Sequence, residues 1–262
     1  MTAEAGDKEM RTLSGMGIEV ERLGQGRPLL LLQGEEALEA ESDVVAKLAS
    51  DFEVIIPSYP GFGASERPLW ITRPHDIAFI LLDLVEQLEL KNTAVIGFSL
   101  GGWIAAEMAT IDDGFMSRLV LVDPYGVKLG GPTDRDIADI WMQRPERVLS
   151  QKWHDQDKSR RDFKSMPDEK LAVIARNIET TARFCWEPYM HNPKLKHRLH
   201  RIHVPTLFVW GEHDGIVKAD PYGKGYASLV PGATLTIIPD AGHLPHLEQP
   251  EAFLKTVTDF IS

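Results

Sequence analysis

Short apolar segments alternate with longer amphipathic segments along most of the chain. Seven short runs rich in Val, Ile, Leu and Thr predict strands, at 18–22, 29–33, 53–57, 93–97, 119–123, 206–210 and 234–238. Several of these runs are almost entirely apolar, which is typical of strands covered on both faces of a sheet. Apolar residues recur at three- and four-residue spacing between the strands and predict helices over 76–88, 101–110 and 250–260. The alternation predicts an α/β fold with a mostly parallel central sheet flanked by helices.

The segment 127–203 interrupts this alternation. It holds few β-branched runs and many charged and aromatic residues, and its stretch 168–183 has helical spacing. It carries 16 Lys and Arg against 11 Asp and Glu, whereas the rest of the chain carries 12 against 28. A solvated helical face explains this difference equally well. We therefore expect an α/β core at 1–126 and 204–262, with 127–203 inserted between its two parts as a helical cap.

Composition narrows the class of protein mainly by exclusion. The 262 residues carry a formal net charge of −11, with an isoelectric point near 5.3, which argues against binding to nucleic acid or to anionic lipid. The single cysteine, Cys185, cannot form an intrachain disulfide and is expected to be a small buried apolar side chain. The first ten residues have no apolar run, so we expect no signal peptide or membrane span, and a cytoplasmic protein.

The most informative motif is Gly-Phe-Ser-Leu-Gly-Gly at 97–102. It follows a predicted strand and precedes a predicted helix, and its G-x-S-x-G spacing is typical of a nucleophile elbow. Such a sharp turn strains the backbone of Ser99 and directs its Oγ out of the sheet. Gly97 and Gly101 meet the need for small residues where the chain approaches itself. The backbone N–H of Leu100, at the start of the helix, is placed to bind an oxyanion.

A serine nucleophile needs a base, and the base needs an orienting carboxylate. Asp214 lies in the loop after the strand 206–210, and His243 lies in the loop after the strand 234–238. The carboxyl ends of parallel strands meet at one edge of a sheet, so we expect both loops to lie near Ser99. The order Ser, Asp, His along the chain is also typical of α/β folds that carry such an elbow. The sequence thus predicts a catalytic triad of Ser99, His243 and Asp214.

Other residues compete for these roles. Asp123 also ends a predicted strand and is the second candidate for the triad acid. We interpret His246 as a polar residue that leads into a helix, and expect His213, adjacent to Asp214, to face another way. Ser65 is interpreted as a turn residue.

Four segments resemble the α/β-hydrolase fold family, in the branch of small esterases, lactonases, C–C bond hydrolases and haloperoxidase-like enzymes. They read PSYPGFGASERP at 57–68, VIGFSLGGW at 95–103, LFVWGEHDGIV at 207–217 and IIPDAGHLPHLEQPEAF at 237–253. The resemblance covers most of 18–125 and 204–262, and 127–203 is similar to the family's variable cap only in position and helicity. It implies a serine hydrolase that needs no cofactor.

The resemblance also implies a second oxyanion donor in the loop Gln33-Gly34-Glu35-Glu36. The donor is expected to be the backbone N–H of Glu35, acting together with that of Leu100. Family members usually carry His-Gly at the start of this loop, and Gln33 departs from that pattern. A carboxylate beside a developing oxyanion would oppose it, so we expect the side chains of Glu35 and Glu36 to turn towards solvent.

The residues that line the substrate pocket are less clearly marked. Aromatic residues of the insertion are candidates for an apolar cleft above Ser99, although they also suit a lid that simply packs on the core. The candidate pocket residues are Gln33, Gly34, Trp141, Trp153, Phe184, Trp186 and Leu244. The positive balance of the insertion favours a small-molecule substrate that carries an anionic group. A homodimer is compatible with the sequence.

The resemblance leaves three functions open. A small carboxylic ester or lactone is the first substrate class, which corresponds to EC 3.1.1. The alternative is C–C bond hydrolysis of a ring-fission diketone acid, whose enzymes commonly carry an aromatic residue after the histidine and an arginine in the cap. Here Leu244 follows His243, while Arg176 and Arg183 are the possible cap arginines. The third possibility is a non-catalytic ligand receptor on the same fold.

Residue identities argue against several other chemistries. Haloalkane dehalogenases and epoxide hydrolases of this fold carry Asp at the elbow, where this chain has Ser99. The sequence shows no metal-ligand spacing of the H-x-x-x-H, C-x-x-C or H-E-x-x-H type, and no dinucleotide or P-loop motif. We therefore expect no metal and no cofactor.

Overall fold

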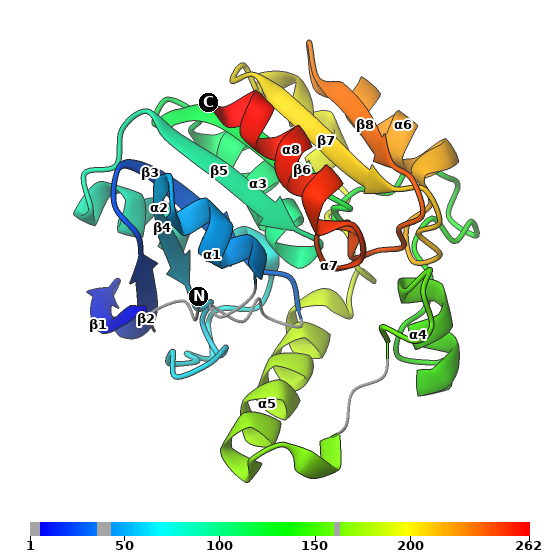
Figure 1. The fold of residues 1–262 in the computed structure, drawn as a ribbon, viewed down its shortest axis with the longest axis horizontal. Coiled ribbons are helices and arrows are strands. Elements are labelled where there is room, and N and C mark those ends of the chain that lie inside the picture. Colours follow the sequence, from blue (N-terminus) through cyan, green and yellow to red (C-terminus); the bar gives the residue numbers. More distant parts are fainter. Residues whose placement is uncertain (1–5, 36–42, 160–162) are drawn as a thin grey trace.

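An eight-stranded sheet forms the centre of the molecule in the computed structural model, which describes residues 6–35, 43–159 and 163–262 (Figure 1). The strand order is β1-β2-β4-β3-β5-β6-β7-β8. β1 pairs antiparallel with β2 and β2 with β4, whereas all other neighbours are parallel. The strands are β1 (Asp7–Leu13), β2 (Met16–Leu23), β3 (Arg27–Leu32), β4 (Phe52–Pro57), β5 (Thr93–Phe98), β6 (Met116–Val122), β7 (Thr206–Gly211) and β8 (Thr234–Ile238). The predicted mostly parallel α/β architecture is confirmed.

Helices cover both faces of the sheet (Figure 1). α1 (Asp43–Ala49) and α8 (Pro250–Ile261) pack on one face, where residues such as Leu48 and Phe253 join a cluster of buried apolar side chains. α2 (Pro74–Gln87), α3 (Leu100–Ile111) and α6 (Lys224–Ser228) pack on the other face around a larger cluster. α7 (Pro245–Glu248) lies in the loop after β8, and a short kinked segment, Ala219–Gly223, lies in the loop after β7. The sheet therefore has the two buried faces that its apolar strands require.

The segment between β6 and β7 contributes no strand to the sheet among its described residues. It contains α4 (Pro145–Lys152), α5 (Asp168–Cys185) and three short 3-10 turns, at Phe163–Ser165, Leu195–His197 and Leu199–Arg201. Figure 1 shows α4 and α5 beyond the end of the sheet at which β5 and β7 terminate. We refer to residues 127–203 as the insertion. Its position over the carboxyl ends of the strands places it beside the loops that carry Asp214 and His243.

The insertion is fastened to the core by polar contacts of α5. Arg176 donates from Nε to the Gly61 carbonyl oxygen at 2.9 Å and from Nη2 to the Ser65 carbonyl oxygen at 2.6 Å. Arg183 is half exposed and lies 3.9 Å from Glu179 on the same helix. Arg176 therefore serves to hold the insertion in place, and neither arginine is directed at Ser99 by these contacts.

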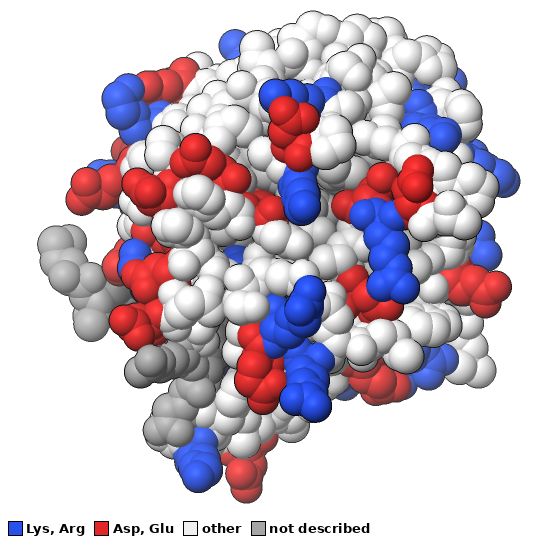
Figure 2. Space-filling model, turned by 90° about the vertical axis from the view of Figure 1, so that its right-hand side faces the viewer, with Lys and Arg blue, Asp and Glu red and all other residues white. Residues whose placement is uncertain are grey.

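Charged side chains of both signs interleave on the face drawn in Figure 2. Within the described residues, none of the helices combines the length and apolarity that crossing a bilayer requires.

Candidate active site

Ser99 sits at a strained turn between β5 and α3. Its φ is 46° and its ψ is −106°, a positive-φ conformation that L-residues rarely adopt outside constrained turns. The turn is closely packed, because a Cβ on Gly97 would lie 2.5 Å from the carbonyl oxygen of Gly101. A Cβ on Gly101 would lie 2.1 Å from the carbonyl oxygen of Leu32. The motif therefore has the steric properties that the sequence predicted for it.

Three side chains from distant parts of the chain meet at this turn. Ser99 Oγ lies 2.7 Å from His243 Nε2, and His243 Nδ1 lies 2.7 Å from Asp214 Oδ2. The side chains of His243 and Asp214 are fully buried. Asp214 is itself fixed by its Oδ1, which accepts hydrogen bonds from the backbone N–H groups of Ile216 and Val217. A hydroxyl, an imidazole and a carboxylate are thus hydrogen-bonded in series.

Asp123, the second candidate for the acid, occupies a different position. Its Oδ1 accepts a hydrogen bond from the Gly211 N–H at 3.0 Å, which ties the ends of β6 and β7 together. Burial, the neighbouring Asp214 charge and a hydrogen bond to Asp214 raise the pKa of Asp123 well above its usual range. One possible metal-ligand atom from each of Asp123, Asp214 and His243 lies within 4.8 Å of the others. Both ring nitrogens of His243 already have hydrogen-bond partners, which argues against a metal ion here.

The other competing residues lie away from Ser99 Oγ. His246 packs its ring against Phe98, 4.4 Å between centroids. His213 is exposed and stacks on His154. Ser65 donates to the Ser58 carbonyl oxygen and accepts from the Glu19 N–H, which fits a turn residue.

The expectation for the side chain of Glu35 is wrong. Glu35 points inwards and is only 7% exposed. Its Oε1 accepts hydrogen bonds from Lys152 Nζ at 2.8 Å and from Tyr125 Oη at 3.1 Å. The ammonium group of Lys152, in the insertion, stabilises the Glu35 carboxylate inside the protein. The side chain therefore does not need to turn towards solvent. Glu36 lies outside the described residues.

The charge of Glu35 is maintained despite its burial. Burial alone raises the pKa of this carboxyl, but the charges of Lys152 and His243 and the hydrogen bonds to the carboxylate outweigh it and bring the pKa to about 2. The backbone N–H of Glu35 is one of these hydrogen-bond donors. A negatively charged group paired with Lys152 therefore lies close to the imidazole at neutral pH.

Tyr125 connects this ion pair to His243. Its Oη lies 2.9 Å from His243 Nε2, and the two rings stack with centroids 5.3 Å apart. Burial and the charges of Glu35 and Asp214 raise the pKa of Tyr125 well above its usual range, so the phenol keeps its proton. Tyr125 therefore donates to Glu35 and presents an oxygen lone pair to the imidazole.

The candidate pocket residues fall into two groups. Gly34 is next to the nucleophile, since a Cβ on it would lie 3.6 Å from Ser99 Oγ. Gln33, whose carbonyl oxygen accepts from Tyr59 Oη, precedes Gly34, and Leu244 is buried directly after His243. These three residues lie on the loops that surround Ser99.

The aromatic candidates of the insertion are more dispersed. Trp141 and Trp186 pack against each other and against Tyr189, while Trp186 remains 53% exposed. Phe184 lines a cavity of about 550 Å³ beside α2, and Trp153 is buried at the end of α4. The ring contacts of Trp141 and Trp186 fit the alternative of internal packing, and the role of these four residues in a substrate pocket stays a prediction.

The sequence analysis missed two residues of the site. Tyr125 comes two residues after the predicted strand that ends at 123, and its position at the carboxyl end of that strand was an available signal. Lys152 gave no signal, because it belongs to the insertion and is brought to Glu35 only by the tertiary fold.

Comparison with known proteins agrees with this architecture. A sequence model described as the Alpha/beta hydrolase family matches residues 34–256, and the chain therefore belongs to that family.

Individual relatives are distant in sequence. The pimeloyl-(acyl-carrier protein) methyl ester esterase of Vibrio cholerae is 27% identical over 252 residues, which cover 90% of this chain and 95% of the relative. An esterase (EaEST) from Exiguobacterium antarcticum superposes with a TM-score of 0.77 at 20% identity, covering 97% of this chain and 99% of that one. A meta-cleavage product hydrolase from Pseudomonas fluorescens has a TM-score of 0.76 at 18% identity, with 96% of each chain covered. The structural likenesses show the shared fold, and the protein is a hydrolase of that fold.

Proposed function

We propose that this protein is a cofactor-independent serine hydrolase that acts on a small carboxylic ester or lactone. The observation that carries the proposal is the hydrogen-bonded series from Ser99 Oγ to His243 Nε2 and from His243 Nδ1 to Asp214 Oδ2, each step 2.7 Å long. The esterase relative from Vibrio cholerae supports the same reaction class. The insertion is proposed to act as the cap over this site.

In the proposed mechanism, Ser99 Oγ attacks the carbonyl carbon while His243 Nε2 takes its proton. Asp214 holds the Nδ1 proton and stabilises the imidazolium that forms. The imidazolium then donates its proton to the leaving oxygen, and an acyl-enzyme remains on Ser99. Water activated by His243 attacks the acyl carbonyl and releases the acid.

The oxyanion is proposed to bind between two backbone N–H groups. The first belongs to Leu100, in the first turn of α3, where helix N–H groups lack intrahelical partners. The second belongs to Glu35. This N–H donates to the carboxylate of the same residue and would donate to the substrate oxygen instead when substrate binds. Because Lys152 neutralises that carboxylate at 2.8 Å, Glu35 opposes the oxyanion less than an isolated charge would.

Tyr125 and Glu35 are proposed to support the base from the side of Nε2. The charged carboxylate attracts the phenolic proton, which leaves the Nε2 lone pair for the hydroxyl of Ser99. Once Nε2 is protonated, the Tyr125 oxygen can accept its hydrogen bond. This second contact would stabilise the imidazolium between proton uptake and proton delivery.

The C–C bond hydrolase remains the second candidate, and one structural neighbour is described as a meta-cleavage product hydrolase. That structural similarity shows only a shared fold, and two residues argue against C–C bond hydrolysis. Leu244 stands where such enzymes commonly carry an aromatic residue, and Arg176 is occupied by the carbonyl groups of the 61–65 loop. A receptor role would not need the strained serine or its aligned base.

A panel of p-nitrophenyl esters, lactones and ring-fission acids tests the proposal. Wild type is expected to hydrolyse short esters or lactones, and Ser99→Ala to lose at least about 10⁴-fold in kcat. The control is Ser228→Ala, an exposed serine on α6, which is expected to keep wild-type rates. Turnover of ring-fission acids alone would favour the second candidate. Ester hydrolysis by purified Ser99→Ala at the wild-type rate would overturn the mechanism.

A further inference from the structure

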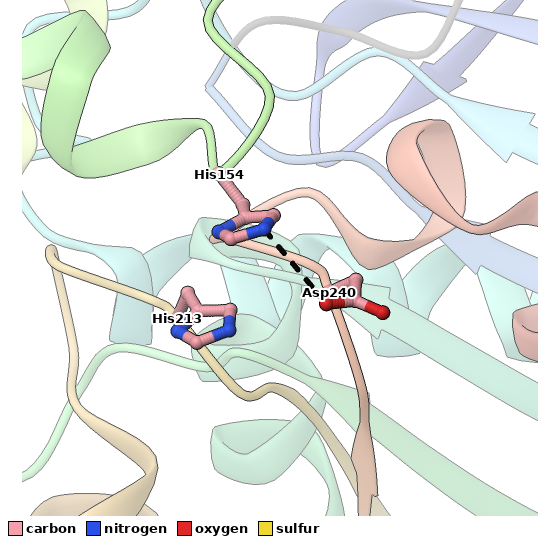
Figure 3. A group of neighbouring side chains, drawn as sticks. All are labelled: His154, His213 and Asp240. Atoms are coloured by element: carbon pink, nitrogen blue, oxygen red, sulfur yellow. Dashed lines mark ion pairs between the residues drawn. The ribbon is translucent and has the colours of Figure 1, made fainter.

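Two histidines and an aspartate converge where the insertion meets the core. His154 follows α4, His213 lies in the loop after β7, and Asp240 lies in the loop after β8. The imidazole rings stack with centroids 4.1 Å apart and planes 15° from parallel, and His154 Nε2 lies 3.9 Å from Asp240 Oδ1. Figure 3 shows that each ring presents a nitrogen on the side of Asp240. One ligand atom from each residue lies within 4.8 Å of the others.

We propose that this cluster binds a divalent transition-metal ion, for which Zn²⁺ is the appropriate probe. Two imidazole nitrogens and one carboxylate oxygen form a donor set that Zn²⁺ prefers, and water can complete the coordination because all three side chains are exposed. Zinc bonds to such donors are about 2.0–2.2 Å long, so the three side chains must draw closer on binding. Their exposure leaves them free to rotate without disturbing the core.

The backbone segments that carry the donors are already held together. The His213 N–H donates to the Ala241 carbonyl oxygen at 2.8 Å, which joins the two core loops. The His243 N–H donates to the Lys152 carbonyl oxygen at 2.7 Å, and the Asp155 N–H donates to Glu248 Oε1 at 2.7 Å. His154 lies between these two anchored positions of the insertion. Metal binding would therefore order three side chains on a backbone that needs little rearrangement, which favours affinity.

The position of the cluster gives the ion a structural consequence. His213 immediately precedes Asp214, and Asp240 lies three residues before His243. His154 lies two residues after Lys152, which reaches into the site to pair with Glu35. An ion held by these three donors would clamp the insertion to both loops that carry the proposed base and acid. It would lie outside the Ser99 chemistry, so hydrolysis would not require it.

Ion pairing alone is the competing explanation of the cluster. His154 faces Asp240, and His213 Nε2 lies 3.6 Å from Glu212 Oε2, so protonated imidazoles would also find acidic partners here. The two explanations differ in what they predict for zinc. Ion pairing alone predicts no zinc affinity that depends on both histidines.

The test is a zinc titration of tag-free, EDTA-stripped protein against a chromophoric chelator. Wild type is expected to bind one Zn²⁺ with a dissociation constant in the micromolar range or below, and His154→Gln and His213→Gln to weaken binding by at least about tenfold. His200→Gln, an exposed histidine elsewhere in the insertion, is the matched control and is expected to bind like wild type.

Thermal unfolding provides a second readout that does not depend on activity. Zinc at about 100 times the wild-type dissociation constant is expected to raise the melting temperature of wild type by about 5 °C and that of both histidine variants by about half as much or less. Unchanged zinc affinity in His154→Gln and His213→Gln, or no micromolar binding by wild type, would overturn the proposal. Neither result would bear on the hydrolase function, because binding is measured without turnover.

Discussion

At the residue scale, the site depends on how one imidazole is surrounded. Asp214 holds its Nδ1, while Ser99 and Tyr125 both approach its Nε2, at 2.7 and 2.9 Å. The sequence was sufficient to predict that Ser99, Asp214 and His243 lie together, because each follows a strand and parallel strands end at a common edge. It was not sufficient to place Glu35, whose inward orientation depends on Lys152 from a distant segment.

Replacing Tyr125 by Phe should separate the role of its hydroxyl from its packing. Phe preserves the buried ring but removes the hydrogen bonds to Glu35 and His243, so kcat/KM is expected to fall about tenfold and the free energy of unfolding by about 1–3 kcal/mol. The acid limb of the kcat/KM profile should also move, because the imidazolium loses a partner. Steady-state kinetics across pH 5–9 and urea unfolding provide the measurements. A wild-type profile in Tyr125→Phe would show that the hydroxyl has no part in catalysis.

Glu35 should make the stability of the protein depend on pH in a defined window. Its pKa falls from an ordinary 4.5 when unfolded to about 2 when folded, so its stabilising contribution is present above pH 4.5. That contribution, about 3 kcal/mol, should be lost as the pH falls from 4.5 to 2. Urea unfolding at stepped pH should show a smaller loss in Glu35→Gln than in wild type. An equally steep loss in both proteins would contradict this electrostatic interpretation.

At the element scale, the strand-to-helix turn between β5 and α3 is the feature most closely specified by sequence. Gly97 and Gly101 flank Ser99, and a side chain on either glycine would collide with nearby backbone atoms. The elements missed by the sequence analysis had weak patterns. β1 is a largely exposed strand, and its run of charged residues lacks a buried face. Pairing with β2 along its whole length, rather than its own sequence pattern, makes it a strand.

Gly101→Ala tests the closeness of this turn. The new methyl group would meet the backbone carbonyl oxygens of Leu32 and Gln33, which cannot move without disturbing β3, so unfolding free energy should fall by about 3 kcal/mol. Gly114→Ala is the control, because its Cβ would meet only the side chain of Asp112. Urea denaturation of both variants measures the difference. Equal stability of Gly101→Ala and wild type would show that the turn can open.

At the scale of the whole molecule, seven of the eight described strands of the sheet could be predicted and the arrangement of the insertion could not. All seven predicted strands occur. The apolar runs of β3, β4, β5, β6 and β7 are largely buried, whereas β8 at the edge of the sheet is mostly exposed or half-buried. The insertion reveals its helices through periodicity, but its docking depends on single polar contacts such as Arg176 with the 61–65 loop. Such contacts leave no periodic signal. For the same reason, no motif spacing in the sequence predicted that His154, His213 and Asp240 lie together.

The most direct measurement of the central claim is covalent labelling of the enzyme by a fluorophosphonate, followed by peptide mass spectrometry. A serine activated by His243 should react and place one adduct on the peptide that contains Ser99, with loss of ester hydrolysis in proportion to labelling. Ser99→Ala should take up no label. Labelling at another residue, or an unlabelled Ser99 in a protein that hydrolyses esters, would contradict the account.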